Sequence, residues 1–258
     1  MSGTGEPGGT TRGTYQAYSS MSPIETFKGN LAEVDRLINF DRELFQLVTY
    51  TLESLHAQLR THHADDRLNG ARALAVIRGI RDNETVKAKY KTIYNQAVVL
   101  LVSHFASALG DLFRTAVSKR LLSADPGKLL EEEFKLTVAD LKERDWNLGG
   151  AVPDLLIAKH DFTFQDMGAT VRAFGAYTNL DPPRGELMNN IITAQACRHV
   201  IVHAGGRVSE KSVKQVSKAH SRTFRPLLAT GEQLSITLQE VEAIKVDMLR
   251  FVETLAGM

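Results

Sequence analysis

One short stretch of the sequence holds an arginine and two histidines, Arg198, His199 and His203. Arginine binds phosphate through paired, charge-assisted hydrogen bonds. Histidine takes up and releases protons near neutral pH. An arginine beside a histidine therefore has the groups that phosphodiester cleavage needs, one to hold the phosphate and one to move protons.

These residues are expected to lie at the end of a helix that is apolar on nearly every side. At about 100° per residue, the direction in which Arg198 points is surrounded by apolar side chains, namely Leu187, Ile191, Ala194, Ile201 and Val202. Such a helix is buried on nearly every side. A charged arginine there is costly unless it has a partner or lines a cleft.

The polar residues near the end of this helix share one face, because residues three or four apart lie on the same side. We call these residues the polar strip: Gln195, Arg198, His199 and His203. One of the next two glycines, Gly205 or Gly206, suits the left-handed position that ends a helix. His203 then lies in the final turn, where the helix dipole favours the protonated imidazole.

Four interpretations of the polar strip compete. His199 and His203 have the spacing of two zinc ligands, but Val200 stands where a metalloprotease has glutamate, and no third ligand lies nearby in sequence. Alternatively, Arg198 pairs with a carboxylate of the bundle and His203 only caps the helix. A third interpretation is a module that binds a nucleotide or RNA without cutting it. The fourth is a ribonuclease.

The segment after the strip is basic, although the chain of 258 residues has a formal net charge of only +1. Between Arg207 and Arg225 it holds six lysines and arginines against the single Glu210. Charge concentrated in this way suits binding of a phosphate backbone, although a solvated basic helix or loop gives the same pattern. The candidate RNA-binding residues are Arg207, Lys211, Lys214, Lys218 and Arg222.

Composition narrows the class of protein. At 43% hydrophobic and 24% charged residues, the chain resembles an ordinary globular protein. Its single cysteine, Cys197, excludes a disulfide framework or a cysteine-based zinc site within one chain. No window is expected to be long and apolar enough to cross a bilayer, and the start of the chain lacks a signal pattern. We therefore predict a cytoplasmic protein.

The pattern of apolar residues predicts an all-α helical bundle. We expect a disordered leader over residues 1–21, a helix that begins with the capping box Ser22–Glu25, and a long central helix over residues 84–122. Residues 62–66 interrupt the pattern, as a loop rather than a metal site. Further helices are predicted over residues 129–146, with Glu131 to Glu133 on a solvated face, over residues 162–177, and from the capping box at Thr237.

The strip and its setting resemble the HEPN superfamily of helical domains. Ribonuclease members of that family carry an arginine and a histidine with four to six residues between them, and Arg198 and His203 have four. The trailing glycines, the late extended piece 234–236 and the final helix are also similar. On this resemblance residues 90–258 form the HEPN-like domain, and residues 22–89 complete its bundle.

The resemblance implies a metal-independent endoribonuclease without cofactors that acts as a homodimer, with the two motif helices facing across a shared cleft. Cleavage through the RNA 2′-hydroxyl would leave a 2′,3′-cyclic phosphate and a 5′-hydroxyl. Arg198 would hold the phosphate, His203 would act as general acid or base, and His199 would position the RNA or the catalytic pair. Family members often serve in phage defence or as toxin-like effectors, which implies a defence-system or antitoxin partner. The alternative is a non-catalytic HEPN-like module that binds a nucleotide or RNA or regulates a partner protein.

Overall fold

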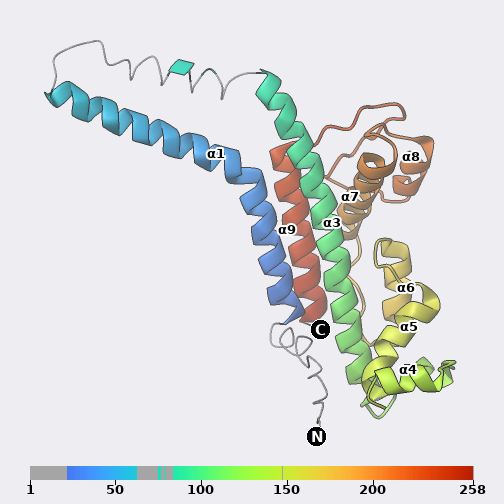
Figure 1. The fold of residues 1–258 in the computed structure, drawn as a ribbon. Helices are drawn as coiled ribbons and strands as arrows, with labels where there is room; N and C mark the ends of the chain where they lie inside the picture. Colours follow the sequence, from blue (N-terminus) through green and yellow to red (C-terminus); the bar gives the residue numbers. More distant parts are fainter. Residues whose placement is uncertain (1–21, 63–74, 77–78, 80–83, 147, 258) are drawn as a thin grey trace, which may run out of the picture.

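The computed structural model describes residues 22–62, 75–76, 79, 84–146 and 148–257 (Figure 1). These residues form helices and no strand; an isolated antiparallel bridge joins Arg207 and Gln233. The prediction of an all-α fold is therefore confirmed for the described part of the chain. The predicted disordered leader, residues 1–21, and residues 63–66 of the predicted loop lie outside it.

Three helices form the main layer of the molecule: α1 (Pro23–His62), α3 (Glu84–Leu121) and α9 (Leu238–Ala256). Each contacts the other two. Aromatic side chains join them, because the Phe105 ring of α3 lies 6.2 Å from that of Phe27 and 5.5 Å from that of Phe251. The long helix predicted over residues 84–122 is confirmed as the central helix of the bundle.

The prediction that no window is apolar enough to cross a membrane is wrong for α3. Among the described residues, Tyr90–Leu121 is long and apolar enough for a membrane span by length and composition, and 61% of its most apolar window is buried inside the protein. The core helix of a bundle passes the same test because it is covered by other helices on most sides.

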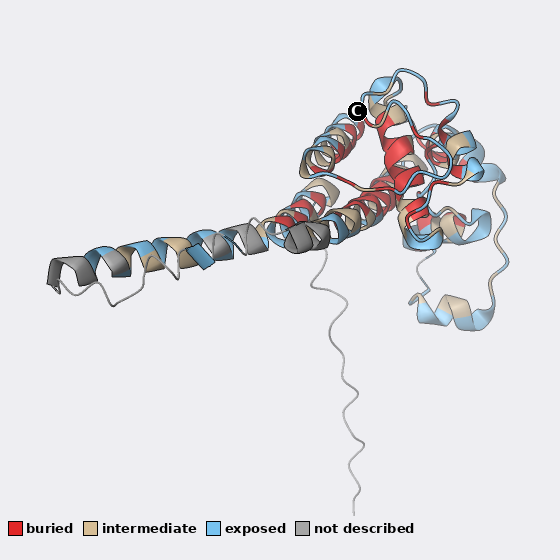
Figure 2. Ribbon diagram, turned by 90° about the horizontal axis from the view of Figure 1, so that it is seen from above, coloured by how far each residue is buried: buried red, intermediate tan, exposed pale blue. Residues whose placement is uncertain are grey.

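The two halves of α1 have different surroundings. Phe27, Leu31 and Val34 are buried against the bundle. Beyond residue 39 the helix continues away from the bundle, and Figures 1 and 2 show this arm reaching past α3 and α9. Large apolar side chains are exposed there, including Phe40 and Leu47. The helical period of the apolar residues predicts the helix but not which part of it is covered.

Shorter helices lie on the other side of α3 (Figure 1): α5 (Val152–His160), α6 (Met167–Tyr177), α7 (Glu186–His203) and α8 (Glu210–Val216). The predicted helix over residues 162–177 is confirmed from Met167 onward. Helix α5 is not among the predicted helices. Pro153 occupies its first turn, where the missing N–H of proline costs nothing.

The prediction of a single helix over residues 129–146 is wrong. A 3₁₀ helix, η1 (Gly127–Glu131), is followed by extended chain and then by the short helix α4 (Val138–Glu143). The capping box of Thr137 and Asp140 begins α4 there. Glu132, predicted on a solvated face, instead turns inward to partners on α5 and α6. Tertiary hydrogen bonds thus replace the expected helix.

The ends of α7 and α9 agree with the sequence. Gly205 and Gly206 have left-handed backbones with φ of +58° and +79°, and the Gly206 N–H donates to the Val200 carbonyl at 3.0 Å. Thr237 and Glu240 form the predicted capping box at the start of α9. Residues 234–236 between these helices have no regular secondary structure, and Ile236 N–H donates to Asn95 of α3 at 3.1 Å.

Candidate functional site

Helix α7 is mostly buried against α3, α8 and α9, as its composition predicts. Its interior residues include Ile191, Ala194, Ala196, Cys197 and Val200, each no more than 1% exposed. The burial decreases over the last two turns. Arg198 and His199 are half-buried there, and Val202 and His203 are exposed. The chemistry-bearing part of the polar strip therefore lies where the helix leaves the core.

Arg198 has no hydrogen bond or ion pair with any described residue. Its Nε is enclosed and lacks an acceptor, whereas its terminal nitrogens are not enclosed. The interpretation that Arg198 pairs with a carboxylate of the bundle is therefore wrong. A half-buried guanidinium without a partner is electrostatically unfavourable. It is available for an anion that comes from outside the described chain.

The two histidines of the strip lie against each other. Their ring centroids are 4.8 Å apart, with the planes tilted by 46°. The pKa of His199 is lowered from its ordinary value, first by burial and then by the positive charges of His203, Lys211 and Arg198. The His199 imidazole is therefore neutral near pH 7 and able to accept a proton.

Gln195 differs from the other residues of the polar strip because it lies inside the protein. It is 4% exposed, and its Oε1 accepts a hydrogen bond from Met167 N–H at 3.3 Å. Its Nε2 is enclosed without a partner. Helical spacing correctly puts Gln195 on the Arg198 side of α7. The packing of α6 over that turn removes it from the surface.

Cys197 takes no part in the chemistry of the strip. The thiol is fully buried, and burial raises its pKa to about 12. A thiol with that pKa stays protonated and is a poor nucleophile at neutral pH.

The basic segment supplies exposed cations beside the strip. Lys211 of α8 lies close enough to lower the pKa of His199. Lys211, Lys214 and Lys218 are exposed and have no ion pair with any described residue. Arg207 is exposed too, with one terminal nitrogen donating to the Gly231 carbonyl at 3.0 Å. We call Arg207, Lys211, Lys214 and Lys218 the basic surface.

Arg222, predicted to bind RNA, has a different role in the structure. All three nitrogens of its guanidinium donate to backbone carbonyls, those of Val216, Ala219, Arg225 and Pro226, at 2.8–3.1 Å. Arg222 thereby fixes the loop that follows α8. The sequence reveals its charge but not these acceptors, so we leave Arg222 out of the basic surface.

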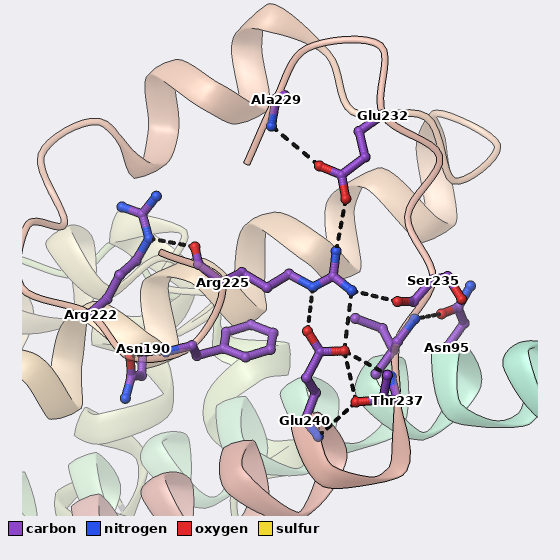
Figure 3. A network of polar contacts seen from close by, with 11 residues as sticks. Asn95, Asn190, Arg222, Arg225, Ala229, Glu232, Ser235, Thr237 and Glu240 are labelled. Carbon is purple, nitrogen blue, oxygen red and sulfur yellow. Dashed lines mark hydrogen bonds and ion pairs between the residues drawn. The ribbon is translucent and has the colours of Figure 1, made fainter. Parts of the chain in front are cut away.

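Arg225 is held inside a polar network at the start of α9 (Figure 3). Its Nε lies 2.7 Å from Glu240 Oε1 and its Nη1 3.3 Å from Glu232 Oε1, and it also donates to the Ser235 carbonyl. Its side chain is 12% exposed. The network ties the loop after α8 to α9 and so supports the end of α7.

Asn190 anchors the same loop from α7. Its Oδ1 accepts hydrogen bonds from the N–H groups of Thr223 and Phe224, both at 3.0 Å. Its Nδ2 donates to Asp247 at 2.8 Å. The sequence offers a signal for this role, because a polar residue on a helix that is apolar all round is buried and needs partners. Asn190 is thus a structural residue rather than an RNA ligand.

A second polar group, which the sequence analysis missed, lies between the segment after η1, α5 and α6. We call it the Glu132 cluster: Glu132, Lys159, His160 and Tyr177. Burial acts to raise the pKa of Glu132, but hydrogen bonds from Lys159, Tyr177 and His160 outweigh it and lower the pKa to about 2. Burial and Glu132 together raise the pKa of Tyr177 to about 12. The polar groups of the cluster satisfy one another, although Lys159 and His160 remain partly exposed.

Among the described residues, no group of three or more histidine, cysteine, aspartate or glutamate side chains could hold a metal ion. His199 and His203 therefore have no third protein ligand in that part of the chain.

The fold and the site together define an all-α bundle that presents an unpaired guanidinium and two imidazoles at the end of a core helix. The chain matches no family model, no curated protein and no solved structure.

Proposed function

We propose that this protein is a metal-independent endoribonuclease with a HEPN-like bundle, and that Arg198 is its phosphate ligand. The observation that carries the proposal is the guanidinium of Arg198, which has no partner in the described chain. It lies one residue from a neutral imidazole and beside a basic helix. A phosphodiester supplies the negative charge that this site lacks.

The proposed reaction is attack of the RNA 2′-hydroxyl on its own phosphate. One imidazole takes the 2′-hydroxyl proton, the 2′-oxygen bonds to phosphorus, and the bond to the 5′-oxygen breaks. A protonated imidazole gives that leaving oxygen a proton, so the products are a 2′,3′-cyclic phosphate and a 5′-hydroxyl. Arg198 stabilises charge on the phosphorane oxygens. The neutral His199 suits the base, which extends its role beyond positioning, and His203 suits the acid.

The active form proposed is a homodimer in which two α7 ends face each other. Each copy then contributes one guanidinium and two imidazoles to a shared cleft. Val202, 45% exposed between the two histidines, supplies apolar surface for such a contact. A role in phage defence or as a toxin-like effector, with an antitoxin partner, rests on the HEPN resemblance alone.

The experiment compares wild type, Arg198→Ala and His203→Ala on labelled RNA in EDTA. Arg172→Ala is the matched control, since Arg172 is exposed on α6. We expect cutting by wild type and the control, cyclic-phosphate ends, and no cutting by the other two. RNA binding by wild type without cutting would identify the non-catalytic binding module instead. Activity that requires added zinc would favour the metal interpretation of His199 and His203.

The basic surface is tested separately by its dependence on salt. Lys214→Glu and Lys218→Glu are expected to weaken RNA binding on all sequences and to reduce the slope of log affinity against log salt by about one each. Lys128→Glu, an exposed lysine far along the chain in η1, is the control. If Lys214→Glu and Lys218→Glu leave the RNA affinity unchanged, the basic surface is not part of the RNA-binding site.

A further inference from the structure

A cavity of about 340 Å³ lies where α3 and α9 end, at the same end of the bundle (Figure 1). Its walls come from the last turns of α3, from the Asn179–Leu180 turn after α6, and from the last turn of α9. The polar strip lies near the other end of α9, because Glu240 acts on the pKa of Cys197. At about 1.5 Å per residue, the two places are roughly 20 Å apart along α9.

The lining of this cavity combines apolar and cationic side chains. Leu112, Leu180 and Leu255 are among its apolar residues, and Lys119, Arg120 and Asn179 are among its polar ones. None of the described lining residues is acidic. Neither Lys119 nor Arg120 forms an ion pair with any described residue. The cavity therefore carries uncompensated positive charge next to apolar surface.

Arg120 is fixed in place before any ligand arrives. Its Nη1 donates to the Thr178 carbonyl at 2.7 Å. Its Nη2 lies against Gly127, because a Cβ added to Gly127 would come within 2.4 Å of this nitrogen. A glycine is therefore needed at position 127 to leave room for the Arg120 side chain, and also because the backbone there has a φ of +58°. Nη2 has no acceptor in the described chain, and Nε is enclosed without one. A fixed guanidinium whose Nη2 is accessible and without an acceptor favours an anionic oxygen, as in a carboxylate or phosphate.

The carbonyls at the end of α3 do not account for these cations. Lysine and arginine near a helix end often serve its last carbonyls. Here the Lys119 carbonyl accepts from Leu122 N–H at 3.2 Å, and the Arg120 carbonyl accepts from Ser123 N–H at 3.1 Å. The Ser123 hydroxyl donates to the Arg120 carbonyl as well, at 2.7 Å. The Lys119 ammonium and the Nη2 of Arg120 are thus left for another acceptor.

We infer that this cavity is a binding site for a small organic anion with an apolar body. A carboxylate or phosphate group would be held by Arg120 and Lys119, and a short hydrocarbon part would lie against Leu112, Leu180 and Leu255. The volume is at the small end of the range for ligand pockets. This site is independent of the proposed ribonuclease activity.

The test is calorimetric titration of the full chain with hexanoate and with hexyl phosphate. Hexanol, which lacks the charge, and inorganic phosphate, which lacks the apolar body, separate the two contributions. We expect both amphipathic anions to bind saturably and each control compound to bind at least about 10-fold more weakly. The stronger of the two anions identifies the headgroup. Hexanol binding as tightly as hexanoate, or no saturable binding of either anion up to about 10 mM, would overturn the inference.

Variants locate the binding. Arg120→Met should weaken both anions about 10- to 100-fold, whereas Lys128→Met, an exposed lysine outside the lining, should leave affinity unchanged. Because Arg120→Met also breaks the bond to Thr178, Ala256→Trp provides a second variant that fills the cavity from the end of α9. Loss of binding by Ala256→Trp with an unchanged circular dichroism spectrum supports the site. Wild-type affinity in Ala256→Trp would place the ligand elsewhere and refute it.

Discussion

The Glu132 cluster and the polar strip contain similar residue types, but their charges have different surroundings. In the cluster, Glu132 accepts hydrogen bonds from Lys159 and Tyr177, and His160 lies 3.3 Å from its Oε1. In the strip, Arg198 has no partner among the described residues, and the rings of His199 and His203 lie against each other. A satisfied polar group stabilises a fold, whereas an unsatisfied one is available to a ligand.

The largest effect should come from removing the unpaired charge. Arg198→Met is expected to lower RNA cleavage by at least about 100-fold, because the phosphorane loses its charged ligand. Stability should be unchanged or higher, since the charge has no partner to lose. Single-turnover cleavage and urea unfolding of the same preparation measure both quantities. If Arg198→Met unfolds so easily in urea that unfolding explains its lost cleavage activity, then Arg198 is a structural residue.

Removing a paired arginine should have the opposite signature. Arg225→Met leaves Glu240 and Glu232 without their cation, and we expect a loss of about 3 kcal/mol in the free energy of unfolding. Urea unfolding measures it, with Lys214→Met as an exposed control that should resemble wild type. An Arg225→Met protein as stable as wild type would show that the network of Figure 3 contributes nothing to the fold.

The Glu132 cluster should stabilise the protein by a smaller amount that depends on pH. The pKa of Glu132 is about 2 when folded, below its ordinary value of 4.5, so its stabilisation is present above pH 4.5 and is lost as the pH falls toward 2. Glu132→Gln should cost about 2 kcal/mol at pH 7, because Lys159 is 40% exposed and solvent screens part of the attraction.

Unfolding of wild type and Glu132→Gln at several pH values checks this expectation. The two proteins should converge in stability as the pH falls from 4.5 toward 2. A difference between them that is constant over that range would mean that Glu132 acts through packing and not through its charge.

The smallest effect concerns the charge that α8 places beside the strip. Lys211→Glu should raise the pKa of His199, because a cation that disfavours the imidazolium is replaced by an anion that favours it. The titration of the His199 ring proton, followed by NMR, reports the change. Lys218→Glu is the control, since Lys218 is not among the groups that act on His199. If the pKa of His199 shifts equally in Lys211→Glu and Lys218→Glu, it responds to the overall charge of the protein and not to Lys211 in particular.

Local sequence signals were the most reliable guide. The capping box at Thr237 and Glu240 and the glycines after His203 are confirmed because each depends on hydrogen bonds within a few residues. The helix spacing that unites Arg198, His199 and His203 is local in the same sense. The prediction failed at residues 129–146, where Glu132 bonds to residues more than 20 positions away.

The sequence by itself determined the all-α class, the boundaries of the helices that have strong end signals, and the shared face of the polar strip. Tertiary structure decided which charges are free. It gave Arg222 and Arg225 their acceptors, buried Gln195 and Asn190, and left Arg198 without a partner among the described residues. The physical reason is that helical period and capping depend on near neighbours, whereas the partner of a charge is set by segments that meet only in the folded chain.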